Sequence, residues 1–152
     1  MVVTSSVAGR IGAPGGSSYS ATKFALQGYF DTLRSEMSMT SGIDILTVLP
    51  GPVESEIVEK AIRGENIPES QEGEKMSTSR CTQLMIRAMS YPKLFDEIWI
   101  STQPVLATIN IYTYLPWVAK QVAKRVLGPK RVEAMREGGN IFDAGKMFGL
   151  KK

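Results

Sequence analysis

The feature that most constrains the fold is an aliphatic run at residues 43–49, which Pro50-Gly51-Pro52 ends. A run of this kind bounded by turn residues predicts a strand. Residues 1–5 read as the end of another buried strand. Between them, apolar residues recur at helical spacing up to a predicted stop at Gly42, and they are Ala21, Phe24, Ala25, Tyr29, Leu33 and Met37. Two strands joined by a helical crossover of roughly 25 residues predict the α/β class with a parallel sheet.

The rest of the chain continues the alternation of helices and strands. A short helix is expected at about residues 54–62, a polar surface loop at 63–77 and a longer helix at 78–90. Residues 94–100 read as a third strand, and the sequence from residue 105 to about 136 reads as helix, apolar at first and then basic.

Composition excludes several kinds of site. The 152 residues contain no histidine, which excludes Ser-His-Asp and Cys-His nucleophiles and histidine metal sites. The single cysteine, Cys81, excludes an internal disulfide and a Cys-cluster zinc site. Because Cys81 lies on an apolar helix face without a neighbouring base, we expect an inert buried thiol. No metal is therefore expected, and a net charge of +3 is too small to indicate a nucleic-acid partner.

Tyr19 and Lys23 are the residues best suited to acid/base chemistry. They are four residues apart on the predicted helix and so share one of its faces. A cation close to a phenol favours the phenolate and lowers its pKa from about 10. Ser6 follows the first strand at the carboxyl edge of the sheet, where parallel sheets bind ligands. Taken alone, such a pair also occurs by chance, and the weight comes from the surrounding residues.

Those surrounding residues resemble the short-chain dehydrogenase/reductase family. Ser6-Val7-Ala8-Gly9 precedes Tyr19-Ser20-Ala21-Thr22-Lys23, and Ser6 lies thirteen residues before Tyr19, as the family's serine does. The resemblance implies that Tyr19 donates a proton to a carbonyl oxygen, that Lys23 assists it and holds the nicotinamide ribose, and that Ser6 stabilises the substrate oxygen. It further implies a loop beneath the nicotinamide, formed by Pro50, Gly51, Val53 and Ser55, where Ser55 stands in place of the family's usual threonine.

A closer resemblance to one subgroup of the family extends over three segments, at residues 51–58, 76–81 and 97–101. It implies NADP(H) in preference to NAD(H), a lipophilic alcohol or carbonyl substrate of steroid or retinoid type, and the endoplasmic reticulum membrane as location. A cytoplasmic location is the alternative. The family match covers about residues 1–100.

The chain also departs from the family pattern. The TGxxxGxG turn that cradles the pyrophosphate, the Asn-Ala-Gly segment and the catalytic asparagine are not found in the 152 residues. The resemblance therefore implies the carboxyl-terminal half of a Rossmann-like doubly wound sheet, which would be inactive alone. The alternative is a non-catalytic interaction module that forms a homodimer or binds full-length partners through the Tyr19 helix.

This interpretation divides the chain in two. Residues 1–101 are expected to be the catalytic half of the Rossmann-like domain, and residues 102–152 a helical extension. An uncharged stretch at 98–119 precedes a basic one in the extension. The extension is therefore expected to lie on a membrane surface or to act as a lid over a lipophilic pocket, and these two roles are compatible.

Overall fold

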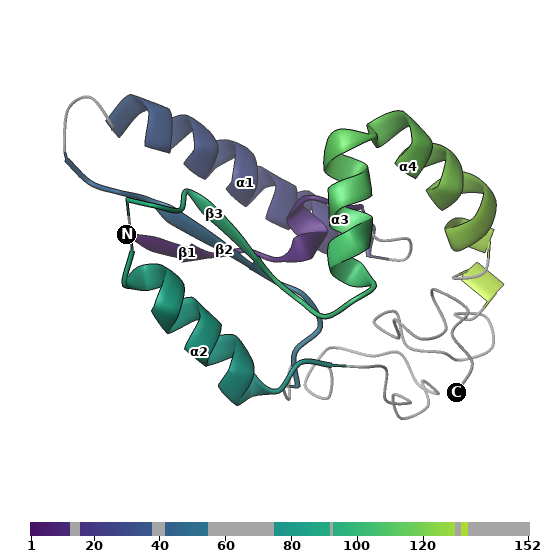
Figure 1. Ribbon diagram of the computed structural model, residues 1–152. Coiled ribbons are helices and arrows are strands. Elements are labelled where there is room, and N and C mark those ends of the chain that lie inside the picture. Colours follow the sequence, from purple (N-terminus) through teal and green to yellow (C-terminus); the bar gives the residue numbers. More distant parts are fainter. Residues whose placement is uncertain (13–15, 38–41, 55–74, 92, 130–131, 134–152) are drawn as a thin grey trace.

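Three parallel strands with helices on both sides form the centre of the structure (Figure 1). The computed structural model describes residues 1–12, 16–37, 42–54, 75–91, 93–129 and 132–133. In chain order the elements are β1 (Val2–Thr4), the 3₁₀ turn η1 (Val7–Gly9), α1 (Ser17–Met37), β2 (Leu46–Pro50), α2 (Thr78–Met89), β3 (Glu97–Ile100), α3 (Val105–Tyr114), α4 (Pro116–Val122) and the π-helical turn η2 (Ala123–Leu127). The sheet order is β1-β2-β3, which confirms the predicted α/β class.

Two strands begin later than predicted. Strand β2 starts at Leu46 because Leu46 is the first residue of this run that pairs with β1, opposite Val2. The amide of Leu46 donates to the carbonyl of Met1 at 2.9 Å. Strand β3 starts at Glu97 because Leu94 still belongs to a turn, in which its amide donates to the carbonyl of Tyr91 at 3.0 Å. Pairing with a distant segment therefore decides where β2 starts, and a local turn decides where β3 starts.

The two faces of the sheet differ in chemistry. On one face, α2 covers an apolar cluster that contains Leu46, Val48, Ile100, Cys81 and Ala88. Side chains of consecutive strand residues alternate between faces, so the intervening strand residues turn to the other face. There α1 crosses the sheet (Figure 1), and polar contacts help to join the two, as in the bond from Arg34 to Thr47 Oγ1 at 3.0 Å.

The first helix and the segment after β2 agree with prediction only in part. Helix α1 ends at Met37 within the described residues, five positions before the predicted stop. Gly42 does have a positive φ of 62°, a conformation that glycine adopts without a steric cost. The predicted helix at 54–62 falls almost wholly outside the described residues, and the same holds for Ser55.

The carboxyl-terminal sequence predicted as helical is divided between separate helices. Helix α3 ends at Tyr114, and α4 begins at Pro116, which occupies its first turn. Proline lacks an amide hydrogen and disfavours the helical conformation in the residue before it, and Leu115 accordingly has φ −130° and ψ 58°. No helix of the described residues is both long and apolar enough to cross a membrane.

Candidate active site

Ser6 lies where β1 ends, and its side chain links two strands. Its Oγ accepts a hydrogen bond from the amide of Ala8 at 3.2 Å and so caps the η1 turn. The same hydroxyl donates to the carbonyl of Pro50, the last residue of β2, at 3.4 Å. The structure thus brings together two of the residues predicted for the site, Ser6 and Pro50, at the carboxyl edge of the sheet.

Tyr19 and Lys23 form a second pair, in the first turns of α1. The Nζ atom of Lys23 lies 5.7 Å from the centroid of the Tyr19 ring, so a cation faces the phenol ring. Tyr19 is 38% exposed and Lys23 is half-buried. The expectation that both side chains share one helix face is therefore met.

The backbone of Lys23 connects this helix to the loop that carries Ser6. Ser5 Oγ donates to the carbonyl oxygen of Lys23 at 3.4 Å. A Cβ atom added at Gly9 would lie only 2.8 Å from that same oxygen, so a side chain there would push η1 away from α1. Our sequence analysis quoted Gly9 only as the end of the Ser6-Val7-Ala8-Gly9 motif and did not predict this close contact with α1.

Gly51 occupies a similarly tight place beyond β2. Its amide donates to the carbonyl of Ile100 at 2.8 Å, and a Cβ atom there would overlap Ser101 Oγ and lie 2.7 Å from Ser101 Cβ. The side chain of Ser101 is buried, and its Oγ has no hydrogen-bond partner among the described residues. An unpaired buried hydroxyl therefore lies against the loop that was predicted to meet the nicotinamide.

Val53 holds that loop to the chain before α2. It forms an isolated parallel bridge with Met76, whose amide donates to the carbonyl of Pro52 at 3.0 Å. Ser55, the remaining predicted cofactor contact, lies outside the described residues. The structure therefore describes three of the four predicted loop residues, Pro50, Gly51 and Val53.

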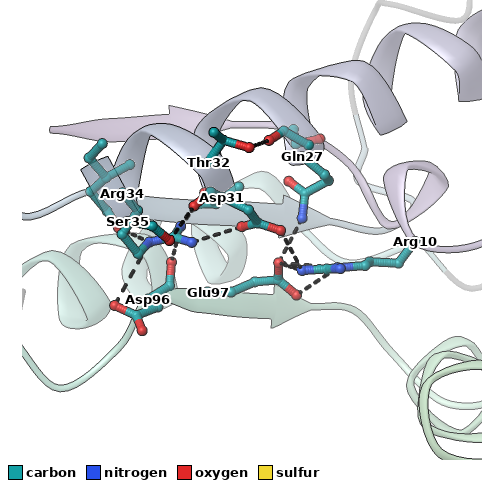
Figure 2. Close-up of polar contacts among 12 residues, drawn as sticks. Arg10, Gln27, Asp31, Thr32, Arg34, Ser35, Asp96 and Glu97 are labelled. Atoms are coloured by element: carbon teal, nitrogen blue, oxygen red, sulfur yellow. Dashed lines mark hydrogen bonds and ion pairs between the residues drawn. The ribbon is translucent and has the colours of Figure 1, made fainter. Parts of the chain in front are cut away.

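A polar network beneath α1 was missed by sequence reasoning (Figure 2). Arg10 Nε donates to both carboxylate oxygens of Glu97, at 3.1 and 3.2 Å, and Gln27 Nε2 donates to Glu97 Oε2 at 2.6 Å. Asp31 joins this group to Arg34 through a 2.7 Å ion pair. The hydrogen bonds from Arg10 to Glu97, together with the nearby negative charges, raise the pKa of the Arg10 guanidinium. No local pattern could have paired residues 87 positions apart.

The described residues contain no group of three or more Cys, Asp or Glu side chains placed to hold a metal ion.

Comparison with known proteins identifies the family. A model described as short chain dehydrogenase matches residues 1–66. Dehydrogenase/reductase SDR family member 7 from Homo sapiens is 36% identical over 142 residues, which cover 91% of this chain. The Mus musculus protein of the same name is 39% identical over 141 residues, or 88% of this chain. The chain belongs to the short-chain dehydrogenase/reductase family. The closer resemblance over residues 51–58, 76–81 and 97–101 is to this member 7 subgroup, and these matches confirm it.

Only part of each relative is matched by the chain. It spans 41% of the length of the human protein and 40% of the mouse protein. Among solved structures, a short-chain dehydrogenase from Burkholderia cenocepacia J2315 in complex with NADP superposes with a TM-score of 0.62 at 18% identity, over 82% of this chain and 46% of that one. That superposition supports the fold assignment, since identity at this level shows the fold alone.

Proposed function

We propose that this chain supplies the catalytic half of an NADP(H)-dependent oxidoreductase that interconverts an alcohol and a carbonyl compound. The observation that carries the proposal is the packing of the Tyr19–Lys23 pair against the Ser6 loop through the carbonyl of Lys23. This contact places the Lys23 cation and the Tyr19 phenol beside the loop that carries the Ser6 hydroxyl. The loop lies at the carboxyl edge of a parallel sheet, where such sheets bind ligands.

In the direction of reduction, each of the three residues has one task. Tyr19 Oη gives its proton to the carbonyl oxygen of the substrate as that oxygen gains negative charge. The Lys23 ammonium stabilises the negative charge left on the phenol oxygen. Ser6 turns its hydroxyl from the long bond to Pro50 toward the substrate oxygen. When bound, the nicotinamide supplies the hydride that attacks the carbonyl carbon, so that hydride and proton together convert the carbonyl to an alcohol.

The loop after β2 fits the carboxamide of a nicotinamide. Gly51 presents backbone without a side chain, and the unpaired Ser101 hydroxyl beside it offers both a donor and an acceptor. We assign Pro50, Gly51, Val53 and Ser55 to this contact, and Lys23 and Tyr19 to the ribose side. We propose NADP(H) in preference to NAD(H) from the resemblance to the member 7 subgroup.

The substrate class is proposed from a relative, and the phosphate contacts are proposed from the sequence. Hydroxysteroid 11-beta-dehydrogenase 1-like protein A from Xenopus laevis is 33% identical over 107 residues, which supports a lipophilic substrate of steroid or retinoid type. Because the TGxxxGxG turn is not found in the 152 residues, we propose that a segment outside this chain grips the pyrophosphate. Residues 1–101 are then the catalytic part, and residues 102–152 the helical extension.

Isotope transfer tests this proposal. The complete enzyme is given NADPH deuterated at the transferable ring position together with steroid and retinoid carbonyl compounds. Mass spectrometry is expected to find deuterium on the carbinol carbon of an alcohol product. A complete, folded protein that binds NADPH but reduces none of these compounds would contradict the proposed substrate class.

The surface of α3 and α4 supports a second role, contact with a membrane surface, as suits the proposed location at the endoplasmic reticulum rather than in the cytoplasm. Tyr114 is 74% exposed, Trp117 73% and Leu115 57%, and the exposed cations Lys120 and Lys124 follow on α4 and η2. Exposed aromatic residues next to cations suit the boundary of an anionic bilayer. The lid role remains compatible with this placement.

Flotation with phosphatidylserine vesicles tests the membrane role. Trp117→Ser and Lys120→Glu are expected to reduce flotation. The matched controls Tyr29→Ser and Arg80→Glu change another exposed aromatic, on α1, and an exposed cation, on α2, and they should float like the parent. Equal flotation of all four variants would contradict the membrane role and leave only the role of a lid over the substrate pocket.

The interaction module remains the alternative function, and the outer side of α1 favours it. Ala21, Ala25 and Gly28 are exposed there beside Phe24, which is 45% exposed, so a second helix could approach closely. Light scattering of the parent and of Ala25→Glu tests for a homodimer, with Ser79→Glu on α2 as the control. A monomeric parent would exclude the homodimer.

A further inference from the structure

The carboxylate of Glu97 is a meeting point of three elements. It receives hydrogen bonds from Arg10, from Gln27 and from the indole of Trp99, and it is only 15% exposed. Arg10 follows η1, the turn that Ser6 caps, while Gln27 lies on α1 and Glu97 itself opens β3. One side chain therefore ties the loop after β1 and the first helix to the third strand (Figure 2).

The position of Gln27 on α1 gives this contact a bearing on the proposed chemistry. Tyr19, Lys23 and Gln27 follow one another at intervals of four residues, and side chains at this interval share one helix face. Gln27 is 3% exposed, and its amide nitrogen is held by Glu97 at 2.6 Å. Any rotation of α1 that moved Gln27 away from Glu97 would turn Tyr19 and Lys23 by the same angle.

The strength of the contact favours a fixed geometry. A guanidinium that reaches both oxygens of a carboxylate is held in direction as well as distance. A carboxylate with little exposure to water also needs its donors, because an unpaired buried charge is costly. Arg34 adds a second attachment further along α1, where its Nε donates to the carbonyl of Ile45 at 3.0 Å.

We propose that Glu97 is a positioning residue that sets the rotation of α1, and with it the direction in which Tyr19 presents its hydroxyl. The proposal rests on the proposed function, since it assigns Glu97 to that same site. Glu97 acts through Gln27 on the helix and through Arg10 on the Ser6 loop, and it takes no part in proton transfer.

A kinetic experiment separates positioning from stability. In the complete enzyme, Glu97→Gln and Gln27→Ala are expected to lower kcat about tenfold or more, because small displacements of reacting groups are costly in rate. The dissociation constant of NADPH should change less than threefold. The kcat of the double variant should be no lower than that of the more impaired single variant, because both substitutions remove the same coupled contact.

Two control variants share the neighbourhood of Glu97. Asp96→Asn removes a neighbouring carboxylate that is 83% exposed, and Ile98→Ala weakens the opposite, apolar face of β3. At temperatures below their melting temperatures, both variants should have a kcat near that of the parent. Ile98→Ala could instead lose as much kcat as Glu97→Gln at a similar loss of melting temperature. The role of Glu97 would then be structural only, and the proposal would be overturned.

A spectroscopic measurement judges Glu97 independently of activity. With 3-fluorotyrosine incorporated at position 19 of the full chain, Glu97→Gln and Gln27→Ala should shift or split the fluorine resonance, whereas Asp96→Asn should not. An unchanged resonance in Glu97→Gln overturns the positioning role. A shifted resonance in a protein without any NADPH-dependent reduction supports Glu97 and contradicts the proposed function instead.

Discussion

The ammonium nitrogen of Lys23 lies 5.7 Å from the centre of the Tyr19 ring, one helical turn away on α1. The carbonyl oxygen of Lys23 also accepts a hydrogen bond from the Ser5 hydroxyl and lies close to Gly9. One residue thus contacts the phenol with its side chain and the Ser6 loop with its backbone. Substitutions of Lys23 change only the first of these contacts, which makes the residue suitable for testing.

Lys23→Ala in the complete enzyme is expected to lower kcat and to weaken NADPH binding together. The cation that stabilises negative charge on Tyr19 is lost, and so is the proposed contact with the ribose. Steady-state kinetics and calorimetric titration of NADPH measure the two effects. Normal cofactor affinity alongside a reduced kcat would remove Lys23 from the ribose contact.

Gly51→Ala is expected to destabilise the fold by about 1 to 3 kcal/mol, since overpacking forces neighbouring atoms to move. The new Cβ would overlap Ser101 Oγ. Urea unfolding measures the free energy. Gly12→Ala is the control because nothing lies within 4 Å of its added Cβ. The added variant Ser101→Gly should restore most of the loss, and a failure to do so would contradict the stated clash.

The Cys81 thiol should react slowly with a disulfide reagent in the folded protein. Burial raises the pKa of this thiol above that of an exposed cysteine, so less thiolate is present at neutral pH. As the sole cysteine, it gives an unambiguous signal. Reaction in urea should be much faster. Equal rates in the folded and unfolded states would contradict the buried placement.

The same shift has a consequence for stability above neutral pH. The unfolded thiol loses its proton near pH 9, while the folded thiol keeps it to higher pH. The contribution of Cys81 to stability is therefore fully present below about pH 9 and is lost as pH rises toward the folded-state pKa. Cys81→Ser should make the fall in unfolding free energy above pH 9 shallower in urea titrations.

The 152 residues alone are expected to bind NADPH weakly or not at all, because they contain no TGxxxGxG turn for the pyrophosphate. Titration calorimetry measures this directly. A micromolar dissociation constant would mean that residues of this chain hold much more of the cofactor than we propose.

Local patterns account for what could be predicted from the sequence. The strand–helix–strand order, the start of α2 after Ser77 and the shared face of Tyr19 and Lys23 all depend on residues close together in the chain. The start of β2 depends on Val2, and the Glu97 contacts depend on a partner 87 positions away, so neither was visible. The break before Pro116 did have a local signal, since proline seldom continues a helix.

The central claim is that Tyr19 transfers the proton. Tyr19→Phe removes only the hydroxyl, so it should lower the chemical step by roughly two to four orders of magnitude while NADPH binding is retained.

The most direct measurement compares single-turnover reduction rates of Tyr19→Phe and of Tyr29→Phe in the complete enzyme. Tyr29→Phe is the same substitution on the same helix, at a side chain that is 63% exposed. We predict a rate near the parent's for Tyr29→Phe and a loss of at least about a hundredfold for Tyr19→Phe. A near-normal rate for Tyr19→Phe would contradict the assignment of Tyr19 as the proton donor.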